Sequence, residues 1–248
     1  MAEPELEDET SRPGLGPRLA GLAQDAAAGV LFLLGLRAPV YWPRMARGAL
    51  VFPLAAAALG SLVAAVLDLL PADAPRALPA TLGVLLLAGV GGGRFLFDFA
   101  RFCGGGPLGV AALVVMLVGQ GWGLMVLEGN LRDIALVLTP MLGMWAYVVQ
   151  GYGSLPARPD GFAAVFVREM EFTQFATASV SAMAVSLILV NALGTMVLFA
   201  VASSTIVLRI VVHARRGGVS AVSLGAVCVI AETISLVLAG AVVRLVGN

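Results

Sequence analysis

The sequence predicts an all-α integral membrane protein, a bundle of about seven or eight transmembrane helices. Of its 248 residues, 60% are hydrophobic and only 12% are charged, and the mean hydropathy is +0.98. A soluble domain carries roughly 25% charged residues. The apolar runs also lack the alternation of transmembrane β-barrel strands, so the spans are predicted to be helical.

Eight apolar runs approach the roughly 20 residues that a spanning helix needs. Gln24 and Asp25 interrupt the first run, which is therefore the weakest and is expected either to span or to lie in the membrane interface. Glycine and alanine recur inside the runs and permit close helix packing. The predicted spans are 19–36, 48–70, 78–97, 107–127, 131–150, 175–192, 194–212 and 219–243.

The N-terminal segment differs from the rest of the chain. Residues 1–17, MAEPELEDETSRPGLGP, are acidic and contain prolines. A secretory signal begins with basic residues instead. We expect residues 1–17 to form a disordered tail and residues 18–248 to form one polytopic membrane domain.

The arginines indicate an orientation in the membrane. The connections 37–47, 94–106, 151–174 and 213–218 hold more arginines than the connections between them. Arginine-rich short loops stay in the cytoplasm, so these four connections are predicted to be cytoplasmic. The chain is expected to be a multi-pass protein of a bacterial inner membrane.

Four charged side chains lie in or beside predicted spans. Arg94, Asp98 and Arg101 are spaced to share one helix face, whereas Glu232 has no basic residue three or four positions away. Ionisable groups at membrane depth are costly and are functional candidates for that reason. The structural alternatives are that Asp98 pairs with a flanking arginine and that Glu232 is protonated or, as we favour, pairs with an arginine of residues 94–101.

The sequence offers few other candidates for metal ligands, nucleophiles or phosphate-binding loops. The chain has one histidine, His213, and two widely separated cysteines, Cys103 and Cys228, with no metal-ligand spacing. The glycines before Arg94 lack the Lys-Ser/Thr of a phosphate-binding loop. We expect no metal site and no resident cofactor, and the zero net charge predicts no nucleic-acid partner.

Three segments nevertheless resemble the motifs of one family, in the same order along the chain. ARGALVFPLAAAALGSLVAAVL (46–67), LLLAGVGGGRFLFDFARFCGGG (85–106) and RRGGVSAVSLGAVCVIAETISLVL (215–238) are similar to motifs of the cobalamin synthase family, adenosylcobinamide-GDP ribazoletransferase. The loop that ends in GFAAVF is similar to a further motif of that family. The matching positions are Phe52, Pro53, Gly92, Gly93, Gly217, Gly218, Gly225 and Glu232.

This resemblance implies the cobalamin synthase fold and a membrane phosphotransferase that joins an activated corrinoid to a ribazole. It also implies aspartates that hold Mg²⁺, a cation that prefers oxygen ligands. At the family's aspartate positions, however, this chain has Phe97, Arg101, Gly104 and Val222. Asp98 stands one position away, which turns a helical side chain by about 100°.

Three functions remain open from the sequence. The favoured one is a non-catalytic relative that acts as a subunit or scaffold of a membrane complex, with a membrane-protein partner or a second copy of itself. The second is an active ribazoletransferase that uses Mg²⁺, with Asp98 and Glu232 as its catalytic candidates. The third is a small transporter.

Overall fold

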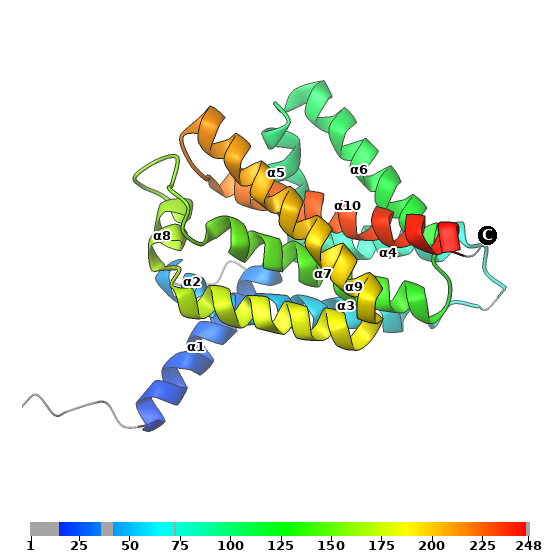
Figure 1. The fold of residues 1–248 in the computed structure, drawn as a ribbon, viewed down its shortest axis with the longest axis horizontal. Helices are drawn as coiled ribbons and strands as arrows, with labels where there is room; N and C mark the ends of the chain where they lie inside the picture. The colour runs from blue at the N-terminus through cyan, green and yellow to red at the C-terminus, as the bar shows by residue number, and fades with distance from the viewer. Residues whose placement is uncertain (1–14, 36–41, 72, 247–248) are drawn as a thin grey trace, which may run out of the picture.

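The structure, a computed structural model, describes residues 15–35, 42–71 and 73–246, which form helices and no strands. Most of the predicted tail, residues 1–17, lies outside the described residues. Figure 1 shows the arrangement of the helices. They are α1 (Leu15–Leu33), α2 (Trp42–Gly48), η1 (Ala49–Val51), α3 (Phe52–Leu67), α4 (Ala77–Gly89), η2 (Val90–Gly93), α5 (Arg94–Phe102), α6 (Gly106–Val126), α7 (Asn130–Gly151), α8 (Phe162–Glu169), α9 (Phe172–Arg216) and α10 (Ala221–Val246).

Six helices in the described part of the chain are long and apolar enough to cross a membrane. The first predicted run, residues 19–36, is not one of them, because its apolar helix covers only Leu19–Leu33. In the described residues the structure thus has six such helices, or seven if the bent pair α4–α5 counts as one span, at the lower end of the predicted count. The six spans are Trp42–Leu67, Gly106–Val126, Asn130–Gly151, Phe172–Val190, Gly194–Arg216 and Ala221–Leu245.

Helix α9 supplies two of these spans. Its 45 residues would measure about 67 Å as a straight helix, more than twice the thickness of a bilayer's hydrocarbon core. Figure 1 shows that α9 instead turns back near its middle. The predicted spans 175–192 and 194–212 correspond to its two halves.

The predicted span 78–97 is broken rather than continuous. Helices α4 and α5 meet at an angle of 70°, and the bend lies at Gly91, Gly92 and Gly93, whose φ angles are 75°, 66° and 73°. Glycine adopts such left-handed angles without the steric cost that a Cβ atom brings.

Two contacts show that the α4–α5 pair carries the chain across the bundle once. Before α4, Arg76 forms an ion pair of 2.6 Å with Glu128, which follows α6. After α5, the Phe102 carbonyl accepts a hydrogen bond of 2.9 Å from Arg216 at the end of α9. Figure 1 shows these two ends of the bundle on opposite sides. Counted with the six spans, this pair gives up to seven spans in the described residues.

Helix α7 forms the centre of the bundle, and most of its residues from Ala135 to Gly151 are buried. Glycines allow other helices to approach the core closely. A Cβ atom on Gly60 of α3 would meet the Leu136 carbonyl oxygen of α7, and one on Gly123 of α6 would lie 2.5 Å from the Leu236 carbonyl oxygen of α10. The resulting core fixes α10 against α6 and α7.

The fold gives a direct test of topology. Arg158 lies in the connection between α7 and α8, and Arg76 lies before α4 at the other end of the bundle. We therefore expect Arg158→Cys and Arg76→Cys to react with a membrane-impermeant maleimide from opposite sides of oriented vesicles. Labelling of both cysteines from the same side would contradict the seven-crossing arrangement.

Candidate functional site

The second and third motif segments meet where α5 packs on α10. A Cβ atom on Gly225 would lie only 2.5 Å from the Asp98 side chain, so this glycine brings the two helices together. Below it, Phe99 of α5 packs with Ala226 and Val229 of α10. The fold therefore juxtaposes two segments that are more than a hundred residues apart in the sequence.

The motif resemblance aligns four positions of this chain with the family's aspartates. Phe97 is 70% exposed on α5, and Gly104 lies in the turn after α5 with a φ of 102°. Arg101 is exposed, and Val222 is half-buried in the first turn of α10. Arg101 and Val222 line the same open pocket.

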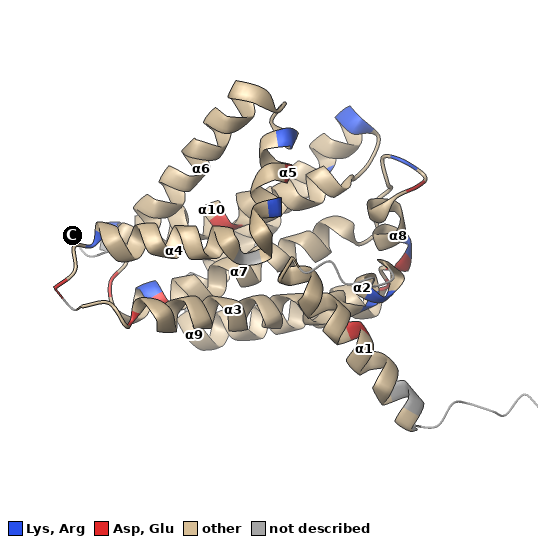
Figure 2. Cartoon of the chain, turned by 180° about the vertical axis from the view of Figure 1, so that it is seen from behind, with Lys and Arg blue, Asp and Glu red and all other residues tan. Residues whose placement is uncertain are grey.

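We call this pocket the arginine pocket, because Arg101, Arg158 and Arg216 all line it. Its volume is about 480 Å³, and the three side chains come from α5, from the α7–α8 connection and from the end of α9. Figure 2 shows basic segments of these three elements on one side of the molecule. From the sequence, Arg158 and Arg216 served only to predict the topology. Both were predicted to lie on the same side of the membrane as Arg101, and this was a signal that the three arginines lie near one another.

A short backbone bridge holds the α7–α8 connection against the start of α10. The Ala157 N–H donates to the Val219 carbonyl, and the Val219 N–H donates to the Leu155 carbonyl, both at 2.8 Å. The Leu155 N–H also donates to His213 Nε2 at 3.1 Å. This bridge positions Arg158 beside the end of α9.

Arg94 does not form the expected ion pair with Asp98. Its guanidinium carbon instead lies 3.6 Å from the centre of the Phe32 ring and 4.5 Å from that of Phe95. Its Nε and Nη2 atoms are buried, with no hydrogen-bond partner among the described residues. Within the same part of the chain, Asp98 has no ion pair with Arg94 or Arg101. Cation–π contacts of this kind contribute about 0.5–2 kcal/mol.

Glu232 lies elsewhere on α10 and does not meet the arginines of residues 94–101. Its side chain packs against Gly143, where a Cβ atom would lie 2.9 Å from the Glu232 Cγ. It lines a cavity of about 30 Å³ together with apolar residues such as Phe95 and Met144. In the described chain it forms no ion pair, so the expected pairing is wrong.

The two candidate acids are also far from each other. Asp98 packs on Gly225, and Glu232 follows Gly225 by seven residues, which is about 10 Å along a helix. Mg²⁺ holds its oxygen ligands at about 2.1 Å. The described residues contain no group of three or more His, Cys, Asp or Glu side chains that could hold a metal ion, so the donor set does not fit the family's cation.

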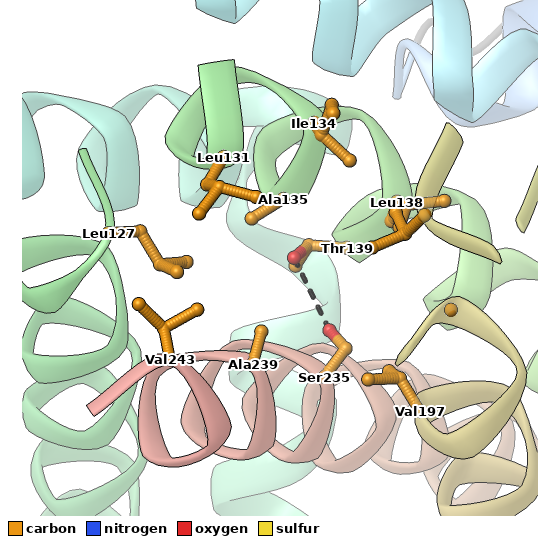
Figure 3. A pocket seen from close by; sticks show the side chains of 12 residues that line it. Leu127, Leu131, Ile134, Ala135, Leu138, Thr139, Val197, Ser235, Ala239 and Val243 are labelled. Carbon is orange, nitrogen blue, oxygen red and sulfur yellow. Dashed lines mark hydrogen bonds between the residues drawn. The ribbon is translucent and has the colours of Figure 1, made fainter. Parts of the chain in front are cut away.

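Another cavity of about 30 Å³ lies between α7, α9 and α10. Figure 3 shows its mostly apolar walls and the hydrogen bond of 3.3 Å that Ser235 donates to Thr139 across it. A space of this size holds about one water molecule. We therefore regard it as a packing gap and not as a site.

One of the comparisons with known proteins supports membership of the family that the motifs resemble. The model of the cobalamin-5-phosphate synthase family matches residues 104–240, which is more than half of the chain. The matched region covers α6 to α9 and most of α10, together with two of the three arginines of the pocket. Neither the curated proteins nor the solved structures gave a match.

Proposed function

The chain belongs to the cobalamin-5-phosphate synthase family. We propose that it is a member that lacks the family's metal-dependent transfer chemistry. We propose further that it acts as a subunit or scaffold of a membrane complex. The residues at the motif positions support the first proposal, and the packing of the helices supports the second.

The replacement of the acids where α5 meets α10 carries the first proposal. The two motif segments are packed together as a shared site requires, yet Phe97, Arg101, Gly104 and Val222 offer no oxygen ligand from their side chains. Asp98 and Glu232 remain, and about 10 Å of α10 separates Glu232 from Gly225, the residue on which Asp98 packs. Two carboxylates so far apart cannot clamp one Mg²⁺ and a phosphate group.

The preserved frame supports the second proposal. Gly225 lets α5 approach α10 closely, and the backbone bridge ties the α7–α8 connection to the start of α10. A helix frame that keeps its packing without its ligand set can still bind a membrane-protein partner or a second copy of itself. Function then lies in binding and not in turnover.

A turnover assay tests the first proposal. We expect the purified protein to form no product from adenosylcobinamide-GDP and ribazole in the presence of Mg²⁺, measured by chromatography against an active family member. The acid that remains beside the motif should not matter, so Asp98→Ala should match the parent protein, as should the control Glu128→Ala at the other end of the bundle. Product formation that disappears in Asp98→Ala alone would contradict the proposal and restore the enzyme interpretation.

The complex is tested in the native membrane. Chemical cross-linking before extraction in a mild detergent should give a species larger than the monomer, of defined composition by mass spectrometry. Recovery of only the monomer after efficient cross-linking of a known complex in the same membranes would contradict a subunit role.

A further inference from the structure

We propose that a second open pocket, at the end of the bundle opposite the arginine pocket, binds the headgroup of phosphatidylethanolamine. Its walls come from the α3–α4 connection, the α6–α7 connection and the helix ends beside them, and its volume is about 520 Å³. The proposal does not depend on whether transfer chemistry is lost, because the motif segments at α5 and the start of α10 lie elsewhere. We call it the headgroup pocket, and its charged lining residues are Asp68, Asp73, Arg76, Glu128 and Arg132.

The headgroup pocket lies where three membrane spans meet the same boundary. The spans Trp42–Leu67 and Gly106–Val126 end there, and the span Asn130–Gly151 begins there. The polar headgroups of a bilayer lie at this depth, directly outside the hydrocarbon core. Between the lining residues Asp68 and Leu70, Leu69 is 83% exposed. The pocket therefore adjoins apolar surface that an acyl chain can cover.

Charged side chains of both signs line the headgroup pocket. Figure 2 shows acidic and basic segments together at this end of the bundle. Arg76 forms an ion pair of 2.6 Å with Glu128, and Arg132 forms one of 2.9 Å with Asp68. Asp73 joins no ion pair within the described residues. Three carboxylates against two arginines leave a net formal charge of minus one, and Asp73 carries the charge that is not compensated.

The helix dipoles do not decide the sign of the ligand at this pocket. Helices α3 and α6 end at it, and helices α4 and α7 begin at it. The C-terminal end of a helix favours a cation and the N-terminal end favours an anion, so the four ends offset one another. The side chains therefore set the preference, and the carboxylate of Asp73 selects a cationic group.

The lining residues favour a primary ammonium group over a quaternary one. Quaternary ammonium groups are recognised mainly by the faces of aromatic rings, and no Phe, Tyr or Trp is among the described residues that line this pocket. A primary ammonium has three N–H donors, which the carboxylates of Asp73 and Asp68 can accept. Charge-assisted hydrogen bonds of this kind are the stronger ones in proteins.

The two arginines match the other charged group of the lipid. Their ion pairs with carboxylates orient both guanidinium groups, and a guanidinium has more N–H donors than one carboxylate uses. The Arg76 side chain is 71% exposed, so its remaining donors can reach a phosphate oxygen outside the pair. Phosphatidylethanolamine carries a phosphate and a primary ammonium joined by a short ethylene link. It therefore offers one group to Arg76 and the other to Asp73.

Native mass spectrometry of the full-length protein in detergent tests the proposal. The protein is titrated with phosphatidylethanolamine and, separately, with phosphatidylcholine of the same acyl chains, whose ammonium is quaternary. We expect phosphatidylethanolamine to bind at least about tenfold more tightly, the difference typical of a charged hydrogen bond. Asp73→Asn should remove this difference by weakening only phosphatidylethanolamine. Because Asp73 joins no ion pair among the described residues, this variant should fold like the parent protein.

Two further variants separate the charged groups of the lipid. Arg76→Gln should weaken both lipids, because both carry the phosphate. Asp160→Asn is the matched control, since Asp160 is an exposed carboxylate at the opposite end of the bundle. It should leave the affinity for both lipids within about twofold, less than the loss of one charged hydrogen bond.

A third ligand separates a lipid from a soluble compound. Soluble phosphoethanolamine lacks the acyl chains and should bind at least about tenfold more weakly than the lipid, because it buries no apolar surface beside Leu69. Equal or tighter binding of the soluble compound would overturn the lipid as the ligand. Equal binding of the two lipids to the parent protein, or an equal loss in Asp160→Asn and Asp73→Asn, would overturn the site itself, whatever the turnover assay shows.

Discussion

Replacement of Gly218 by alanine is expected to lower the free energy of unfolding by about 3 kcal/mol or more. Gly218 has a φ of 151°, which a residue with a Cβ atom rarely adopts, and such strain costs about 1–3 kcal/mol. The new Cβ would also meet the Leu155 carbonyl oxygen and would lie 2.8 Å from the Pro156 carbonyl carbon. Overpacking against backbone adds about 1–3 kcal/mol.

The effect should also reach the arginine pocket. Gly218 lies beside the bridge that holds Arg158 against α10, so Gly218→Ala should also displace the α7–α8 connection that carries Arg158. Gly217→Ala is the matched control, because Gly217 has a left-handed φ of 71° but open space around a Cβ atom. Thermal unfolding in detergent compares the two. Equal losses would mean that strain alone matters and that the contact with Leu155 does not.

Replacement of Gly60 by leucine is expected to cost a similar amount at the centre of the bundle, about 3 kcal/mol. A Cβ atom at this position meets the Leu136 carbonyl oxygen and lies 2.9 Å from the Val137 Cα. Both are backbone atoms of α7, so no rotamer change can make room, and α3 must move away from α7. Thermal unfolding in detergent, read by circular dichroism, measures the loss.

Gly121→Leu on α6 is the control for this substitution. A Cβ atom on Gly121 has no neighbour within 4 Å, and leucine favours a helix by about 1 kcal/mol over glycine. We therefore expect Gly121→Leu to leave stability unchanged or to raise it slightly. A loss at Gly60 no larger than at Gly121 would show that α3 and α7 are not packed as closely as described.

The sequence predicted most of the crossings because the length of an apolar run is a local property. It did not predict the break in 78–97, since three consecutive glycines within an apolar run permit a bend but do not require one. The structure shows the bend because Gly91, Gly92 and Gly93 all adopt left-handed angles. Spacing along the chain alone does not distinguish a straight span from a bent one.

Side-chain partners were harder to predict than helices. Spacing on one helix face suggested that Arg94 pairs with Asp98, whereas Arg94 lies over Phe32, more than sixty residues earlier. The expected pair of Glu232 with an arginine of residues 94–101 fails because Glu232 contacts Gly143 on α7. Each outcome depends on which helices pack together, and no local pattern reports that.

The two ends of the bundle differ in how many carboxylates accompany their arginines, so the electrostatic potential differs between the two ends. At the end that carries the start of α4, Arg76 pairs with Glu128, and Arg132 pairs with Asp68 and Asp133. Three carboxylates outnumber two arginines there, whereas the three arginines of the arginine pocket outnumber its one carboxylate, Asp160. Electrostatic steering of an anion therefore acts from one side of the membrane, with a reach set by the Debye length, about 8 Å at physiological ionic strength. Added salt should therefore weaken the attraction of anions to that side of the protein.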